Sequence, residues 1–271
     1  MEQLMVENIA TVKWERYASH REKTSQLITA LIRPEPVKSM AILGAGSGLD
    51  LELAQWQSLL DQITLIDING QLLDDASAVH PLVDFSKVEQ LGAIDFTGLY
   101  DRLDQPGTMN DWVAAAAKPT KITDRTFDLV VSDAVFSEMI NMIHPSIPEG
   151  DLSMLIRTLR KKHLNDLLSL LNPGGVLVFI TDLVSTASAP DLLQWPEDQL
   201  NLMMEKLLID QNFFAGCNPY AIVNDCENDT ALIENISRIE LTKPWLWRVH
   251  DHQLNLVYAL VMHKNPIEET S

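Results

Sequence analysis

The chain has 271 residues, of which 46% are hydrophobic, and a formal net charge of −18. This composition can form one large core or two small ones. The negative charge repels nucleic-acid phosphates, so we expect no DNA or RNA partner. No apolar run reaches about 18 residues, and the first residues lack the layout of a secretory signal. We therefore expect a cytoplasmic protein with no membrane partner, whose two cysteines, Cys217 and Cys226, are free thiols.

The first predicted element is a helix over about residues 3–33, which ends before Pro34. Its apolar stripe recurs at helical spacing and consists of Leu27, Ile28, Leu31 and Ile32. We expect residues 1–37 to form a helical cap, residues 38–264 the main domain and residues 265–271 a tail.

Apolar runs of strand length then alternate with longer segments of helical periodicity, a pattern typical of a parallel sheet covered by helices on both faces. The runs are SMAIL at 39–43, ITLID at 63–67, FDLVVS at 127–132 and GVLVFITD at 175–182, with a weaker one, VEQLGAIDF, at 88–96. Two final runs, 244–249 and 254–262, are separated only by HDHQ, which favours an antiparallel hairpin. Irregular stretches at 97–126 and 140–150 are where a substrate lid would lie.

The densest basic cluster lies in a segment with leucines at helical spacing. It is interpreted as a solvated helix face rather than a phosphate-binding track. Its members are Arg157, Arg160, Lys161 and Lys162.

Three glycines follow the first predicted strand, in AILGAGSGLDLEL at 41–53. Ligands of a doubly wound sheet bind at the carboxyl ends of its strands, where the strand order reverses. The dinucleotide pattern G-x-G-x-x-G does not fit, because the third glycine comes one residue early and Leu49 takes the place of the last small residue. The spacing G-x-G-x-G is that of S-adenosylmethionine sites, where no pyrophosphate sits on the helix end.

Two acids follow the next predicted strands. Asp67 ends the second strand, where an ionised carboxylate can accept hydrogen bonds from both ribose hydroxyls. Asp95 ends the third strand, where it could accept from an adenine amino group while Phe96 packs nearby. Each acid alone is more often a strand-end or cap residue than a ligand contact, but the combination with the glycines favours a nucleoside site.

In these motifs the chain resembles the class I S-adenosylmethionine-dependent methyltransferases over about residues 38–182. The resemblance implies an α/β, Rossmann-like, seven-stranded and mostly parallel sheet of order 3-2-1-4-5-7-6, with helices on both faces and a C-terminal antiparallel hairpin. It implies S-adenosylmethionine as cofactor. The implied cofactor contacts are Gly44, Ala45, Gly46, Gly48, Asp67, Ile68, Asp95, Phe96, Ser132 and Tyr17.

The family often has an acid two positions before the first glycine, where this chain has Ile42. Asp50 could supply a nearby carboxylate instead, although a helix-start Asp favoured by the helix dipole is the preferred interpretation.

Methyl transfer is an in-line displacement, so positioning dominates and a base is needed only if a proton must leave. Asp133 aligns with the start of the Asn/Asp-Pro-Pro-aromatic motif of enzymes that methylate bases or glutamine, but Ala134 and its neighbours replace the rest. Such an acceptor is therefore disfavoured. Asp133 and Glu138 remain candidate catalytic bases or orienting groups.

A second similarity is to metal-dependent catechol-type methyltransferases, through Asp133-Ala134 and Asp182. Leu183 and Ser137 replace that group's asparagine and lysine, so we expect no metal.

We expect methyl transfer to a small molecule or a peptide of neutral or cationic character, with the acceptor atom and the oligomeric state left open. One alternative is an aminopropyltransferase on the same fold, which would carry more acid around the glycine loop and after the fourth strand. Another is a methyltransferase-like non-catalytic subunit or scaffold.

Overall fold

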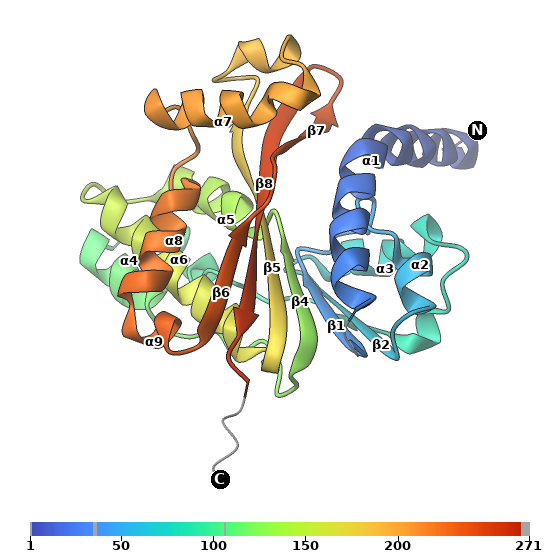
Figure 1. The fold of residues 1–271 in the computed structure, drawn as a ribbon, viewed down its shortest axis with the longest axis horizontal. Helices are drawn as coiled ribbons and strands as arrows, with labels where there is room; N and C mark the ends of the chain where they lie inside the picture. Colours follow the sequence, from blue (N-terminus) through green and yellow to red (C-terminus); the bar gives the residue numbers. More distant parts are fainter. Residues whose placement is uncertain (1, 35–36, 106, 267–271) are drawn as a thin grey trace.

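The computed structural model describes residues 2–34, 37–105 and 107–266 and places one sheet at the centre (Figure 1). Its strands are β1 (Ser39–Leu43), β2 (Gln62–Ile66), β3 (Val88–Leu91), β4 (Phe127–Asp133), β5 (Leu171–Ser185), β6 (Ile236–Leu241), β7 (Trp245–His250) and β8 (Gln253–Lys264). The eight strands follow the order β3-β2-β1-β4-β5-β8-β6, and β7 pairs with β8. Strands β1 to β5 are parallel, whereas β8 runs antiparallel to β5, β6 and β7.

Helices cover both faces of this sheet (Figure 1). They are α1 (Glu2–Ile32), α2 (Leu53–Gln57), α3 (Gly70–Val79), α4 (Met109–Ala116), α5 (Val135–Ile143), α6 (Leu152–Ser169), α7 (Leu200–Ile209), α8 (Pro219–Asn228) and α9 (Thr230–Ile233). Helices α1, α2 and α3 pack on one face, and α4 to α9 contribute to the core on the other. The expected α/β architecture is confirmed.

The two cores follow from the alternation of side chains along each strand. In β1, Met40 and Ile42 join the core under α1 and α2, while Ala41 and Leu43 join the opposite core. Because both faces are covered, the parallel strands are continuous apolar runs.

The antiparallel end of the sheet has one more strand than expected. β6 pairs with residues 260–264 of β8 and β7 with residues 253–257, so the two lie along the same edge of β8. Pro244, which has no backbone N–H, lies in the break between them. The predicted hairpin is confirmed as β7 and β8. The run at 244–249 forms only β7, and β6 and β7 together fill the place beside β8 that was expected for one strand. β6 escaped prediction because most of its side chains are exposed.

The third strand is shorter than expected, because β3 stops at Leu91 rather than continuing to residue 96. Gly92 packs so closely on Gly70 that an added Cβ would lie 2.7 Å from the Gly70 Cα. Ala93 then adopts a left-handed φ of 61°. This turn ends the strand, so Asp95 lies in a loop.

The two stretches expected to be irregular contain helices. Residues 97–126 include α4, which starts with a capping box between Thr108 and Asp111. Residues 140–150 include the end of α5 and a short 3₁₀ turn at His144–Ser146.

The basic cluster on α6 is not the solvated face that was expected. Arg160 and Lys162 are buried. Arg160 pairs with Asp225 of α8, and Lys162 lies 2.7 Å from Asp166. Arg160 therefore ties α6 to α8, and Lys162 also donates to the Phe96 carbonyl at 2.7 Å. The side chain of Arg157 is exposed, as expected.

Helix α1 confirms the predicted N-terminal helix, and its Ile28 and Ile32 are buried in the core of the first face. Residues 267–271, most of the predicted tail, lie outside the described residues. Among the described helices, none is both long enough and apolar enough to cross a bilayer.

Candidate functional site

The glycine loop lies at the carboxyl end of β1 and needs its glycines for backbone reasons. Gly44, Gly46 and Gly48 have φ of 76°, 48° and 75°, in the left-handed region that costs other residues energy. A Cβ on Gly44 would lie 2.6 Å from the carbonyl oxygen of Asp133, whereas one on Gly46 would meet no atom within 4 Å. The loop therefore packs tightly against β4 at one end and opens at Gly46.

Asp67, just after β2, fixes this loop in place. Its Oδ2 accepts a hydrogen bond from the Gly46 N–H at 2.9 Å, and its Oδ1 accepts from the Asn69 N–H at 2.8 Å. A carboxylate oxygen can accept more than one hydrogen bond, so both oxygens retain acceptor capacity for a ligand hydroxyl.

A cavity of about 160 Å³ opens beside the loop. It brings together four of the predicted cofactor residues and the candidate base Glu138. Its lining consists of Gly44, Asp67, Ile68, Phe96, Val135, Glu138, Met139 and Met142. One polar end and one apolar wall are what a nucleoside with a charged tail requires.

A larger groove of about 600 Å³ lies between α1, the start of α7 and the turn before β7. Its lining includes Lys23, Glu197 and Lys243 but none of the glycine-loop residues. Size alone does not identify a site, and this surface groove has neither the close backbone approach nor the buried acid, Asp67, of the smaller cavity.

The side chains of two predicted cofactor residues make hydrogen bonds within the protein instead. Asp95 accepts hydrogen bonds from the N–H groups of Thr97 and Tyr100, so it orders its own loop. Ser132 is buried in the core, where its Oγ lies 3.0 Å from Nε2 of His163. The structure does not bring either side chain to the cavity, and their cofactor contacts stay predictions.

Helix α1 is tied to the loop that follows the glycines. The Arg21 guanidinium donates to the Leu49 carbonyl at 2.7 Å and to Glu52 at 3.0 Å. It also lies 3.4 Å from the ring centroid of Trp14. Tyr17, one turn before Arg21, packs edge-on against Trp247 with ring centroids 5.4 Å apart. The predicted cap thus closes over the strand ends.

His20, which also belongs to α1, has no exposed surface. Its Nδ1 accepts a hydrogen bond from the indole N–H of Trp245 at 3.0 Å, and its ring stacks on Trp247 at 4.3 Å. An indole nitrogen only donates, so Nδ1 must carry a lone pair and the single proton of neutral His20 must be on Nε2. This tautomer is assigned from the hydrogen bond. The Nε2–H faces Asp133, whose Oδ1 is 3.6 Å away.

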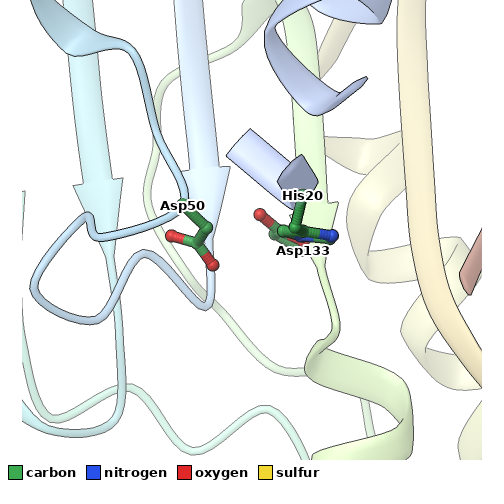
Figure 2. A group of neighbouring side chains, drawn as sticks. All are labelled: His20, Asp50 and Asp133. Atoms are coloured by element: carbon green, nitrogen blue, oxygen red, sulfur yellow. The ribbon is translucent and has the colours of Figure 1, made fainter. Parts of the chain in front are cut away.

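Three side chains from distant parts of the chain converge here, as Figure 2 shows. His20 comes from α1, Asp50 from the turn after the glycine loop and Asp133 from the end of β4. Asp133 is buried, and neither of its carboxylate oxygens has a hydrogen-bond partner among the described residues. Asp182, at the carboxyl end of β5, accepts from the Ser137 hydroxyl at 3.1 Å but leaves Oδ1 without a partner in the described structure.

The backbone after Asp133 is strained. Ala134 has φ 53°, a left-handed conformation that an alanine rarely adopts, and stands at the N-terminus of α5. Strain of this kind persists where the surrounding structure enforces it, and it clusters at functional sites. Here it directs the chain sharply from β4 into α5 at the position that presents Asp133.

The acids are hard to ionise together. Desolvation, then repulsion from Asp133, raises the pKa of Asp50 to about 7. Desolvation, then repulsion from Asp182 and Asp67, raises the pKa of Glu138 to about 7, although solvent reaches this side chain. Desolvation also raises the pKa of Asp182 to about 6. A cluster with several raised carboxyl pKa values binds a cation more readily than an anion.

Burial lowers the pKa of His20, but the Asp133 carboxylate outweighs burial and the pKa lies above its usual value. A second proton would have to enter at Nδ1, where Trp245 donates. Cationic His20 must therefore lose this hydrogen bond to β7.

Three members of the cluster were not among the predicted cofactor or catalytic residues. Asp50 does not start a helix as preferred from the sequence, because α2 begins at Leu53 and its N-cap is Glu52. Its position directly after the glycines was the available signal. Asp182 had a signal too, since it ends the fifth strand, but His20 had none beyond its place in the cap.

Comparisons with known proteins give only distant similarities. No family model matches the chain, and neither does any curated protein. Among solved structures, the N-methyltransferase NodS from Bradyrhizobium japonicum WM9, in complex with S-adenosyl-L-homocysteine, is 16% identical, with 90% of this chain and 86% of that chain covered and a TM-score of 0.47. The YcgJ protein from Bacillus subtilis is 10% identical, with 89% and 97% covered and a TM-score of 0.48.

An O-methyltransferase family protein from Burkholderia thailandensis is 13% identical, with 91% of this chain and 57% of that chain covered and a TM-score of 0.45. Identities and scores this low assign no residue role, cofactor or substrate. The chain's own strand order and glycine loop define the class: it has the Rossmann-like fold of class I methyltransferases.

Proposed function

We propose that the protein is an S-adenosylmethionine-dependent methyltransferase whose acceptor is a small molecule or a peptide. The observation that carries the proposal is the glycine loop, which approaches β4 closely at Gly44 and opens at Gly46 beside a cavity with acids at its edge.

The residues present fit this cofactor. Asp67 has acceptor capacity for ribose hydroxyls, and Ile68 and Phe96 supply an apolar wall for a base. The cofactor has a sulfonium, an ammonium and one carboxylate, so its net charge is positive. Asp50 and Asp133, which lie closest to the loop, complement that charge.

Binding requires a change of shape. The cavity of about 160 Å³ is small beside the roughly 300–1,000 Å³ of typical organic-ligand sites. Since α1 covers the strand ends through Arg21 and His20, we expect α1 to move outward when the cofactor binds.

When bound, the cofactor supplies an electrophilic methyl group. The protein then has to hold the acceptor in line with the methyl carbon and exclude water. Glu138, at the edge of the cavity, can take a proton from an acceptor that must lose one, because its pKa is raised to about 7. Asp133 orients His20 and attracts the positive charge of the ligand.

The experiment is a calorimetric titration of the purified protein with S-adenosylmethionine, S-adenosylhomocysteine and NAD⁺. We expect micromolar binding of the two sulfur ligands and none of NAD⁺, because the third glycine lies one residue too early for a pyrophosphate. Binding of NAD⁺ alone would contradict the proposal. Binding without turnover on any acceptor would favour the scaffold alternative, and transfer of a three-carbon amine would favour the aminopropyltransferase alternative.

A cytoplasmic location belongs to the same proposal. It is supported by the two cysteines, Cys217 and Cys226, which are free and buried. Fractionation of the producing cells would test it.

A further inference from the structure

The site holds more negative charge than the proposed cofactor can neutralise. Asp50 and Asp133 lie within reach of His20 near the glycine loop. Asp182 lies near the carboxyl end of β5, one strand further from the loop than Asp133. Glu138 lines the cavity and lies close enough to Asp182 and Asp67 to feel their charge. In the described part of the chain, no lysine or arginine pairs with Asp133, Asp182 or Glu138.

A cofactor with a net charge of +1 leaves this second group of acids without a counter-charge. Asp182 is buried, with Oδ1 unpartnered among the described residues. An uncompensated buried carboxylate is costly, so the arrangement is suited to a second cation.

A divalent metal is not the cation that this geometry favours. The closest set of ligand atoms is that of His20, Asp50 and Asp133. The hydrogen bond from Trp245 places the His20 proton on Nε2, the nitrogen that faces the acids. A metal needs the lone pair of that nitrogen, whereas an N–H there leaves room for the carboxylates to accept from another donor.

Building on the proposed function, we propose that the methyl acceptor is a small aliphatic amine, which binds as its ammonium ion against Asp182 and Glu138. An ammonium donates three hydrogen bonds and so satisfies acceptor-only carboxylates. Met139 and Met142 line the cavity beside Glu138, and their apolar side chains suit the carbon chain of such an amine. Asp182 lies behind this wall, where it accepts from Ser137, the residue before Glu138. The small volume of the cavity, about 160 Å³, favours a small molecule over a peptide.

The reaction balances with this acceptor. The ammonium first loses one proton to the Glu138 carboxylate, because a protonated nitrogen has no lone pair. The nitrogen lone pair then forms a bond to the methyl carbon of S-adenosylmethionine, and the carbon–sulfur bond breaks with its electron pair retained by sulfur. The products are S-adenosylhomocysteine and the N-methyl ammonium ion, and Glu138 later releases its proton to solvent.

The test compares four-carbon ligands that differ in the kind or number of their polar groups. Butylamine, 1,4-diaminobutane, butanol and butyrate are titrated into the full-length protein saturated with S-adenosylhomocysteine, and S-adenosylhomocysteine itself is titrated separately. We expect the amines to bind and the alcohol and the acid not to bind. In Asp182→Asn we expect amine affinity to fall at least about tenfold, while the affinity for S-adenosylhomocysteine stays within about twofold.

Two variants sharpen the test. Asp124→Asn removes an acid whose side chain is 85% exposed, and it should bind amines as the wild type does. Glu138→Gln should bind S-adenosylhomocysteine normally but lose the rise of methyl transfer with pH, because the proton acceptor is gone. Circular dichroism and a thermal melt show whether each variant folds.

The failures of the two proposals can be told apart. Binding of S-adenosylhomocysteine without discrimination between the amines and butanol overturns the acceptor assignment and leaves methyl transfer standing. Amine binding by a protein that ignores S-adenosylhomocysteine supports the cation site and overturns methyl transfer. Micromolar binding of Mg²⁺ or Mn²⁺ alone, displaced by butylamine, would assign the acids to a metal and overturn the inference.

Discussion

Asp182 shows how one buried acid affects stability and binding in opposite ways. Its pKa is raised from 3.8 to about 6, first by desolvation, so between these values the folded protein holds a proton more tightly than the unfolded chain. Its contribution to stability therefore falls as the pH rises through this window. A bound cation would reverse this loss, because it stabilises the ionised form. The groups that face Asp182 are His20, Asp133, Ser137 and Asn255.

Other buried groups change the stability of the protein with pH in the opposite direction. Burial lowers the pKa of His163 to about 3, so its contribution to stability increases as the pH rises toward 6.5. Only a comparison of variant with wild type isolates Asp182.

We expect Asp182→Asn to increase the free energy of unfolding at pH 8 by about 1–3 kcal/mol and by much less at pH 4.5. The asparagine keeps an acceptor for the Ser137 hydroxyl and removes the buried charge. Urea unfolding at the two pH values measures the difference. Asp124→Asn is the control and should change neither value by more than about 0.5 kcal/mol. A variant less stable than the wild type at pH 8 would show that Asp182 has a partner in solution.

Among the helices, α1 covers the strand ends and is proposed to control access to the site. It is joined to β7 by the hydrogen bond between Trp245 and His20 and to the turn after the glycine loop by Arg21. If α1 must lift before the cofactor binds, weakening one of these ties should accelerate binding.

We expect Trp245→Phe to raise the association rate constant of S-adenosylhomocysteine about fivefold, since one hydrogen bond contributes roughly 1 kcal/mol. Stopped-flow tryptophan fluorescence measures this rate. Trp247→Phe is the matched control on the same strand: it keeps an aromatic ring against His20 and Tyr17 of α1 and, since the Trp247 Nε1 has no partner in the described structure, it loses no hydrogen bond. A Trp245→Phe rate equal to that of the wild type would mean that α1 does not gate the site.

At the scale of the whole molecule, the fold was predictable because the strands of a covered parallel sheet are continuous apolar runs. β6 was not, since most of its side chains are exposed at an edge of the sheet and it is separated from β7 by a segment that ends in Pro244. The end of β3 depended on the packing of Gly92 against Gly70, a contact between distant residues that periodicity does not encode.

The candidate site divides in the same way. Gly44, Gly46 and Asp67 were predictable because their spacing along one loop and one strand end determines where they lie. The meeting of His20 with Asp133 depends on the direction in which α1 crosses the sheet, and the stripe of apolar residues on that helix does not specify it. The sequence therefore predicted the meeting of the glycine loop with Asp67 better than the acid cluster.

The central claim is that the loop holds the cofactor where it opens at Gly46, and one measurement tests it most directly: the affinity for S-adenosylhomocysteine of wild type, Gly46→Val and Gly174→Val, by calorimetry. Both glycines have a left-handed φ, 48° and 76°, and an added Cβ meets nothing within 4 Å at either, so the two variants should suffer similar backbone strain of roughly 1–2 kcal/mol. Only Gly46 belongs to the loop. We predict that Gly46→Val lowers the affinity at least about 100-fold, a loss of roughly 2.7 kcal/mol or more, while Gly174→Val binds like the wild type. Wild-type affinity in a folded Gly46→Val protein would place the cofactor elsewhere.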